Sequence, residues 1–118
     1  MNEAEATATA AAIASGPDRI VLVAIDDDGA RVGFVHVETA VDFFTHESHG
    51  HISTLIVASG GEGRGVGRAL LDAAERWCRA RAYRLLTLNV FEANAAARRL
   101  YDRAGYCVDT IKYLKELS

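Results

Sequence analysis

In the first half of the chain, apolar and β-branched residues gather in short runs that turn residues separate. Residues 19–25 read RIVLVAI and residues 31–38 read RVGFVHVE, with Asp-Asp-Asp-Gly at 26–29 between them. Asp-Gly is a strong signal for a tight hairpin turn. We therefore predict an antiparallel strand pair. A polar loop over 40–50 and a third, more apolar strand over 52–58 are expected to follow.

The second half of the chain changes to helical periodicity. Apolar side chains recur every three or four residues from 66 to 80, which is typical of an amphipathic helix. The same pattern returns over 94–104, where Gly105 suits a helix C-terminus. The run LLTLNV at 85–90 predicts a fourth strand between the helices, parallel to the third. One long strand or two short ones are expected over 106–117.

The N-terminal segment carries weaker signals. Residues 1–15 are rich in alanine and threonine and lack the basic start and long apolar stretch of a signal peptide. We interpret 1–17 as an amphipathic or frayed helix that ends at Gly16-Pro17, because proline cannot continue a helical hydrogen-bond ladder. No linker or internal repeat divides the sequence. We predict a single domain over 1–118 with a mixed α/β sheet.

Composition narrows the class of protein. The 118 residues are 50% hydrophobic and 25% charged with a net charge of -3, which is typical of a globular protein and argues against nucleic-acid binding. No apolar run approaches the roughly 20 residues that cross a bilayer, so no membrane partner is expected. Cys78 and Cys107 are interpreted as small buried apolar groups in the reducing cytoplasm.

Candidate chemistry is concentrated where the third strand gives way to the first helix. Residues 60–67 read GGEGRGVG. Glycines at a helix start let main-chain N–H groups surround an anion, and Arg64 and Arg68 add positive charge at the rim. The loop ends Val66-Gly67-Arg68 instead of the Gly-Lys-Ser/Thr of a P-loop. A dinucleotide motif is also a poor match, because Arg68 occupies its last glycine position.

Two motifs in this order resemble those of the GNAT superfamily of acetyl-CoA-dependent N-acetyltransferases. The first, Glu62-Gly63-Arg64-Gly65-Val66-Gly67, is similar to the acyl-CoA signature Gln/Arg-x-x-Gly-x-Gly/Ala, with Glu62 in place of Gln or Arg. The second is Asn94-x-x-Ala97-x-x-x-Tyr101-x-x-x-Gly105-Tyr106, preceded by Leu88-Asn89-Val90. The resemblance covers residues 52–106. It implies a GNAT-like acyl-CoA N-acyltransferase fold, with the usual N-terminal strand and helix shortened or missing.

The resemblance also implies a cofactor site. Acetyl-CoA would enter a gap between two splayed parallel strands, here 55–58 and 86–90, and the glycine loop would hold its pyrophosphate. Asn94 would bind the cofactor arm, and a backbone N–H such as that of Val57 would stabilise the oxyanion formed when a primary amine attacks the thioester. The cofactor-binding residues implied in this way are Leu55, Ile56, Val57, Glu62, Gly63, Arg64, Gly65, Val66, Gly67, Arg68, Asn89, Asn94, Ala97 and Tyr101.

Three residues are candidates for proton transfer. The resemblance implies that Tyr101 protonates the departing thiolate; the alternative is a core aromatic on the helix stripe. Glu38 and His51 are candidate bases for the acceptor ammonium, with ordered water as the alternative. Histidine as a residue type titrates near neutral pH, which suits this task, and both residues stay candidates. His46 and His49 lie close to His51 in sequence, but their spacing matches no strong zinc pattern, so no metal is expected.

Two other functions stay open. Glu62 and the short N-terminus motivate a non-catalytic acyl-CoA-binding or regulatory module, and a nucleotide-binding α/β domain would bind ATP or NAD instead of coenzyme A. Acidic groups around the hairpin favour a cationic small molecule or a peptide amine as acceptor. A sheet edge left bare by a missing first strand would favour pairing with another chain, so we predict a homodimer.

Overall fold

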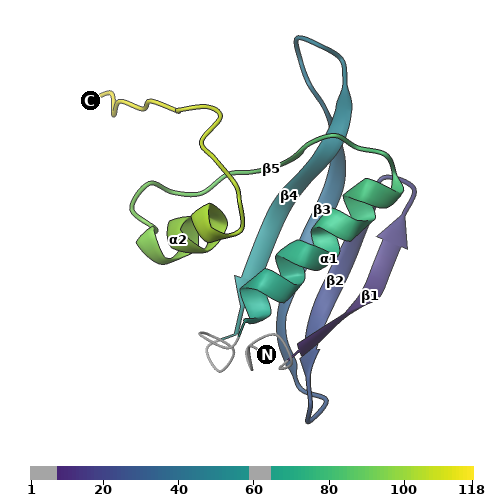
Figure 1. Cartoon of the computed structure of the whole chain (residues 1–118). Coiled ribbons are helices and arrows are strands. Elements are labelled where there is room, and N and C mark those ends of the chain that lie inside the picture. The colour runs from purple at the N-terminus through teal and green to yellow at the C-terminus, as the bar shows by residue number, and fades with distance from the viewer. Residues whose placement is uncertain (1–7, 59–64) are drawn as a thin grey trace.

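The fold is described for residues 8–58 and 65–118 of a computed structural model. It is a mixed sheet with two helices (Figure 1), which confirms the predicted fold class. Neighbouring strands are antiparallel from β1 to β4, and β5 runs parallel to β4. The sheet order is β1 (Ala8–Gly16), β2 (Arg19–Asp26), β3 (Arg31–Val41), β4 (Ser48–Val57) and β5 (Leu86–Leu88), and the helices are α1 (Val66–Ala80) and α2 (Ala95–Arg103).

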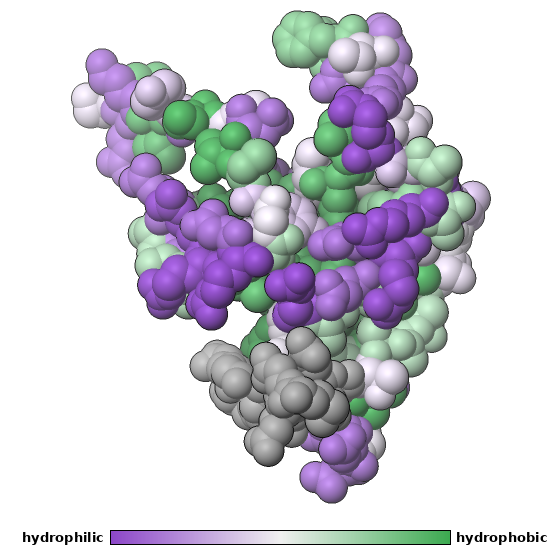
Figure 2. All heavy atoms as spheres, in the orientation of Figure 1, coloured by the Kyte–Doolittle hydropathy of each residue, from purple (hydrophilic) through white to green (hydrophobic). Residues whose placement is uncertain are grey.

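The core lies between the sheet and α1, which crosses one face of it (Figure 1). Leu70 and Leu71 on α1 are completely buried, as are Val35 and Val37 on β3. Because side chains alternate along a strand, these two valines share the face that α1 covers. Hydrophilic side chains occupy the outer surface of α1 (Figure 2), where Arg68 pairs with Asp72 at 3.2 Å. The apolar side chains of α1 thus face the sheet and its hydrophilic side chains face outward, as the amphipathic pattern of the sequence predicts.

Truncating the centre of this core is expected to destabilise the fold. Leu70→Ala removes a fully buried side chain, and such changes cost about 2–5 kcal/mol of unfolding free energy because a cavity remains. Urea denaturation followed by circular dichroism measures the loss. The matched control is Leu114→Ala, whose side chain is 82% exposed and whose replacement should change stability by less than about 0.5 kcal/mol. Equal effects of the two substitutions would contradict this position of the core.

The N-terminal prediction was wrong for residues 8–16, which form strand β1 and not a helix. β1 pairs with β2 through Thr9 opposite Ile25 and Ala14 opposite Val21. Alanine has the highest helix propensity of the amino acids, but intrinsic propensity is a weak determinant, and pairing with an apolar neighbouring strand overrides it here. A two-residue turn at Pro17 and Asp18 joins the strands, so no helix lies between β1 and β2. Residues 1–7 lie outside the described part of the chain.

The predicted strand or strands over 106–117 do not form. In the described residues 104–118 no helix or strand follows α2, and the chain leads away from the sheet (Figure 1). Val108, Tyr113 and Leu117 are 70%, 90% and 87% exposed. An extended segment cannot form hydrogen bonds between its own backbone N–H and C=O groups, so it needs a neighbouring strand. No described strand pairs with residues 106–117, and their strand-like sequence pattern alone does not make them a strand.

The predicted loop over 40–50 is shorter in the structure, because β3 extends to Val41 and β4 begins at Ser48. Asp42 closes the remaining turn by accepting hydrogen bonds from the backbone N–H groups of Phe44 and Thr45 at 3.1 and 2.7 Å. Of the two helices that the structure describes, neither has the length and apolar character needed to span a membrane.

The two cysteines differ in their surroundings, and both are free. Cys78 is buried as predicted, and burial raises the pKa of its thiol to about 11. Cys107 is exposed, which corrects the prediction that it is buried. It follows α2 at the start of the segment that forms no strand, so no neighbouring strand covers it.

Thiol labelling is expected to separate the two cysteines. At pH 8, iodoacetamide should modify Cys107 rapidly and Cys78 slowly, because the raised pKa keeps the Cys78 thiol protonated and burial restricts access. Intact-mass spectrometry should show one label on the native chain and two after denaturation. Rapid double labelling of the native protein would contradict the burial of Cys78.

Candidate active site

The two parallel strands part at a β-bulge. β4 pairs with β5 only over residues 50–52. On the other side of β4, the register with β3 places Val37 opposite Ile52 and His36 opposite Thr54, which leaves Ser53 as the extra residue. A bulge bends its strand and increases the local twist. β4 therefore leaves β5 at the position where the sequence resemblance implied a gap, although nothing in the sequence indicated the bulge.

The main chain of β4 beyond the bulge offers hydrogen-bonding groups to the gap. The N–H of Ala58 donates to the Val32 carbonyl of the β3 side at 2.8 Å. Because successive residues of a strand direct their N–H and C=O groups to opposite sides, those of Val57 and Leu55 point toward β5. β5 does not pair with them. The candidate oxyanion donor, the N–H of Val57, thus faces the gap.

A cavity of about 780 Å³ lies where the strands part, a size typical of a ligand site. β4, the start of α1, the segment after β5 and α2 all contribute to it. The predicted cofactor-binding residues that line it are Leu55, Val57, Gly65, Val66, Gly67, Arg68, Asn89, Asn94, Ala97 and Tyr101. Sequence reasoning did not single out Ser53, Thr54 and Leu100, which line it too.

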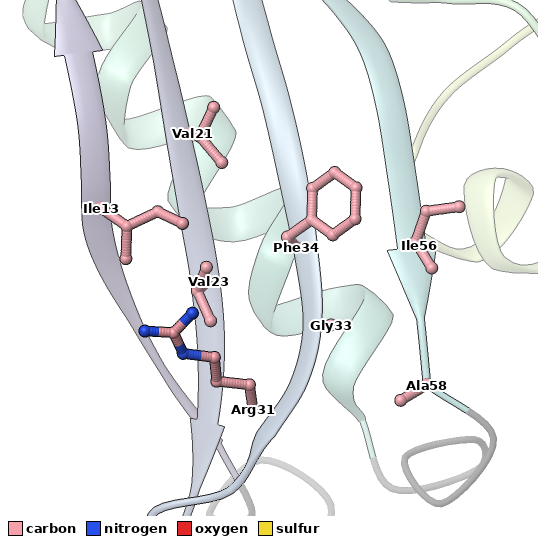
Figure 3. A pocket seen from close by; sticks show the side chains of 8 residues that line it. All are labelled: Ile13, Val21, Val23, Arg31, Gly33, Phe34, Ile56 and Ala58. Atoms are coloured by element: carbon pink, nitrogen blue, oxygen red, sulfur yellow. The ribbon is translucent and has the colours of Figure 1, made fainter.

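The remaining predicted cofactor residues lie elsewhere. The side chain of Ile56 points to the opposite face of the sheet (Figure 3), so only its main chain belongs to the strand at the gap. Glu62, Gly63 and Arg64 fall outside the described residues.

The start of α1 presents its main-chain amides to the cavity. Gly65 is the N-cap residue in the left-handed region with φ 75°, which glycine adopts without steric cost. No side chain among the described residues caps the helix, and its first turn contains no acidic residue. The unpaired N–H groups and the positive end of the helix dipole therefore favour an anion at Gly65–Gly67.

Gly67 permits a close approach of the two helices. A Cβ atom at this position would lie 2.8 Å from Cδ2 of Leu100 on α2 and 3.8 Å from Cγ2 of Val57 on β4. A larger residue would thus meet α2 at the wall of the cavity. The tight packing against Leu100 thus favours a small residue at the second glycine of the motif.

The Asn-x-x-Ala spacing has a local structural cause. Asn94 is the N-cap of α2, and its side-chain oxygen accepts a hydrogen bond from the Ala97 N–H at 3.2 Å. This is the usual reach from an N-cap side chain to the third residue of a helix. The side-chain NH₂ group is a separate donor, and Asn94 is one of the residues that line the cavity. Asn94 therefore caps helix α2 and also forms part of the cavity wall.

Tyr101 projects from α2 into the cavity wall and is half-buried. Its ring meets that of Tyr106 edge-to-face, with centroids 6.1 Å apart. Burial raises the pKa of Tyr101, so the phenol keeps its proton at neutral pH. Tyr106 in turn donates a hydrogen bond from its hydroxyl to Glu75 Oε2 at 2.9 Å, which ties the end of α2 to α1.

The two candidate bases lie together on the sheet face opposite α1. Glu38 on β3 and His51 on β4 are directly opposite in register. His51 Nδ1 lies 2.8 Å from the Thr87 hydroxyl of β5. Neither candidate base lines the cavity. Within residues 8–58 and 65–118, no group of His, Cys, Asp or Glu side chains converges as a metal site.

Beyond these residues, the sheet face opposite α1 is mainly apolar and has a shallow depression. Figure 3 shows side chains of Ile13, Val21, Phe34 and Ile56 on it, around a shallow depression of about 420 Å³ with Arg31 at one end. Ile13 and Ile56 are 52% and 50% exposed. This part of the sheet is uncovered among the described residues, in contrast to the face under α1.

Solved structures share this fold. The tetramutant of the BH1408 protein from Bacillus halodurans superposes with a TM-score of 0.76 at 22% identity, covering 87% of this chain and 69% of that one. The ribosomal-protein-alanine N-acetyltransferase from Brucella melitensis biovar Abortus 2308 gives a TM-score of 0.69 at 24% identity, covering 86% and 72%. At these identities the likeness concerns the fold alone.

Sequence comparison identifies the family. The sequence model of the acetyltransferase (GNAT) family matches residues 2–106. The chain belongs to the GNAT acetyltransferase family. A mycothiol acetyltransferase from Propionibacterium freudenreichii subsp. shermanii is 38% identical over 88 residues, which are 75% of this chain. The chain spans only 28% of the length of that relative.

Proposed function

We propose that this protein transfers the acetyl group of acetyl-CoA to a primary amine. The observation that carries the proposal is the parting of β4 and β5 at Ser53, directly beside the start of α1. Unpaired main-chain groups of β4 would bind the amide-bearing arm of the cosubstrate, and the amides at Gly65–Gly67 would bind its pyrophosphate. Family membership supports acetyl-CoA as the donor.

The reaction needs two proton transfers and one oxyanion. A base takes one proton from the acceptor ammonium, and the freed lone pair forms the N–C bond to the thioester carbonyl. The Val57 N–H would stabilise the oxyanion of the tetrahedral intermediate. When the C–S bond breaks, Tyr101 would give its proton to the thiolate and recover one from the nitrogen of the new amide, so that the net products are amide, thiol and one proton.

The acceptor is proposed from chemistry and from the curated relatives. Two relatives of this chain are named mycothiol acetyltransferases, so amines related to mycothiol are the first acceptors to test. Exposed peptide amines are the second class, as the acidic groups of the sequence favour cationic acceptors in general.

A panel of amines incubated with acetyl-CoA and the purified chain tests the proposal. Free thiol is followed with a chromogenic disulfide, and acetylated product is identified by mass spectrometry. Amine-dependent thiol release is the expected result. Tight binding of coenzyme A with no turnover of any amine would favour the non-catalytic module, and binding of ATP or NAD in preference to coenzyme A would favour a nucleotide-binding domain.

The cellular location and the oligomeric state of the protein stay predictions. We propose a cytoplasmic homodimer, but the sheet edge expected to pair in the dimer differs from the one that the sequence suggested. β1 occupies the sheet edge that a missing first strand would have left bare. Among the described strands the outer side of β1 has no partner, and this edge is the one that we propose pairs with a second copy.

A further inference from the structure

The shallow depression on the sheet face opposite α1 adjoins the candidate active site. Ile56 on β4 and Ala58 just after it both line the depression, and Val57, the candidate oxyanion donor, is the residue between them. Thr54 lines the cavity in the gap and shares the face of Ile56, because side chains two residues apart along a strand point to the same side. The cavity and the depression therefore meet along β4 beyond the bulge.

The open side of the gap is the one toward this depression. On the α1 side, the gap is walled by the start of α1 and by α2, which approach each other closely where Gly67 lies against Leu100. On the opposite side, the described residues leave the sheet uncovered, and Ile56 is half-exposed. An amine held over Ile56 is only about one strand spacing, roughly 5 Å, from the edge of β4 that faces the gap. An acceptor seated in the depression therefore has a short path to the Val57 N–H.

The lining of the depression suits an apolar molecule that carries one anionic group. Apart from Arg31, every residue that lines it is apolar or glycine. The Arg31 side chain reaches across from β3 toward Ile13 and Val23 (Figure 3). Within residues 8–58 and 65–118, no carboxylate forms an ion pair with Arg31, and this includes the aspartates of the neighbouring β2–β3 turn. The guanidinium is thus available to an anionic group of a ligand.

The size of the depression favours a small molecule over a second folded chain. Its volume of about 420 Å³ lies within the range of ligand sites, and 8 residues line it. A stable protein–protein interface instead uses roughly 20–30 residues on each side. From β4 at the gap to β2, toward which Arg31 reaches, the distance is two strand spacings, or roughly 10 Å. An extended peptide rises roughly 3.5 Å per residue, so three residues span that distance.

We propose that this depression is the acceptor subsite, and that the acceptor is a short apolar peptide of about three residues. Its N-terminal nitrogen would lie at the β4 edge and attack the thioester, and its C-terminal carboxylate would pair with Arg31. The bonds that form and break are those of the acetyl transfer described above. This inference rests on the proposed function, and it favours peptide amines among the two classes of acceptor named there.

Three peptides test the subsite on the unmodified chain at saturating acetyl-CoA. They are trileucine, trileucine amide and triglycine. Trileucine should have a kcat/KM at least about 10-fold above that of triglycine, because its side chains leave water when they contact the depression. It should also exceed its amide about threefold, because only the free carboxylate pairs with Arg31 and exposed ion pairs are typically worth about that much. These comparisons do not depend on the folding of any variant.

Two substitutions assign these preferences to their residues. Arg31→Gln should lower kcat/KM for trileucine about threefold and leave that for the amide unchanged. Its matched control is Arg76→Gln, an exposed arginine on α1, which should keep the preference for the carboxylate. Phe34→Ala should lower kcat/KM for trileucine and not for triglycine, because it removes the aromatic ring from the depression. Its control is Phe43→Ala, 83% exposed at the β3–β4 turn, which should change neither.

Chemical-shift mapping with trileucine supplies a readout that does not need turnover. The full chain is titrated with the peptide in the presence of coenzyme A, which leaves no acetyl group to transfer. The largest shifts should occur at Ile13, Arg31, Phe34 and Ile56, which line the depression. Triglycine at the same concentrations should produce much smaller shifts at these residues. The affinity for coenzyme A should be unchanged in the Arg31 and Phe34 variants, because neither residue lines the cavity.

The outcomes separate this inference from the proposed function. Trileucine shifts at the depression in a chain that acetylates no amine would support the subsite and mean that the proposed function has failed. Acetylation of other amines but of no peptide would overturn the inference and leave the proposed function intact. Equal kcat/KM for the three peptides, or preferences that Arg31→Gln and Phe34→Ala do not alter, would overturn it as well.

Discussion

Tyr101→Phe is expected to lower kcat for acetyl transfer by about 10²- to 10⁴-fold, the usual worth of a positioned proton donor. The substitution removes only the phenol oxygen from a half-buried ring in the cavity wall, so the edge-to-face contact with Tyr106 remains. The affinity for coenzyme A should therefore stay within about twofold of the wild type. Single-turnover kinetics measures the chemical step directly.

The matched control for this change is Tyr113→Phe. Tyr113 is 90% exposed and lies in the segment after α2, away from the residues that line the cavity. Its replacement should leave kcat unchanged. If Tyr101→Phe retained the wild-type rate while binding coenzyme A normally, Tyr101 would be a packing residue and another group, such as water, would protonate the thiolate.

The role of Tyr101 also predicts an upper pH limit for the acetyl-transfer activity. A proton donor must be protonated, and burial raises the pKa of Tyr101 above its ordinary value. The activity that depends on the phenol proton is therefore present throughout the neutral range and is lost only as pH rises above about 10, the usual tyrosine value. A rate profile in single turnover checks this. An alkaline decline below pH 9 that is absent in Tyr101→Phe would contradict it.

Gly67→Val is expected to weaken coenzyme A binding by roughly 10- to 100-fold, equivalent to the 1–3 kcal/mol typical of overpacking. Even a Cβ atom at residue 67 would lie 2.8 Å from Cδ2 of Leu100, so the valine side chain must push the end of the Leu100 side chain aside and narrow the cavity beside the first amides of α1. Calorimetric titration measures the affinity, and circular dichroism verifies that the variant folds.

A second glycine provides the comparison for Gly67. A Cβ atom at Gly16, at the end of β1, would meet only Cγ of Arg19 at an ordinary 3.8 Å. Gly16→Val should therefore bind coenzyme A as the wild type does. Equal affinities for Gly67→Val and Gly16→Val would show that the cofactor does not use the start of α1.

Local signals in the sequence were sufficient wherever a turn or cap fixed the structure. The Asp-Gly turn forms as predicted, with Gly29 at φ 81° and Asp26 Oδ1 accepting from the N–H groups of Asp28 and Ala30 at 2.9 Å each. Likewise, the Asn-x-x-Ala spacing marks the start of α2 because Asn94 caps it. These features depend on contacts a few residues apart, which a sequence displays directly.

Features that depend on distant partners were not predictable in the same way. The alanine-rich residues 8–16 become a strand only because β2 offers an unpaired edge, whereas the strand-like segment over 106–117 finds no described partner. The bulge at Ser53 depends on the register between β3 and β4, so the shape of the cavity and the Thr87 contact of His51 could not be derived from spacing.

The central claim is that coenzyme A occupies the gap between β4 and β5 with its pyrophosphate at the start of α1. Amide chemical-shift mapping of the full chain during titration with coenzyme A tests it most directly. We expect the largest shifts at Leu55, Val57, Gly65, Gly67 and Asn94, which line the cavity. No shift at millimolar ligand, or shifts confined to the opposite sheet face around Phe34, would contradict the claim.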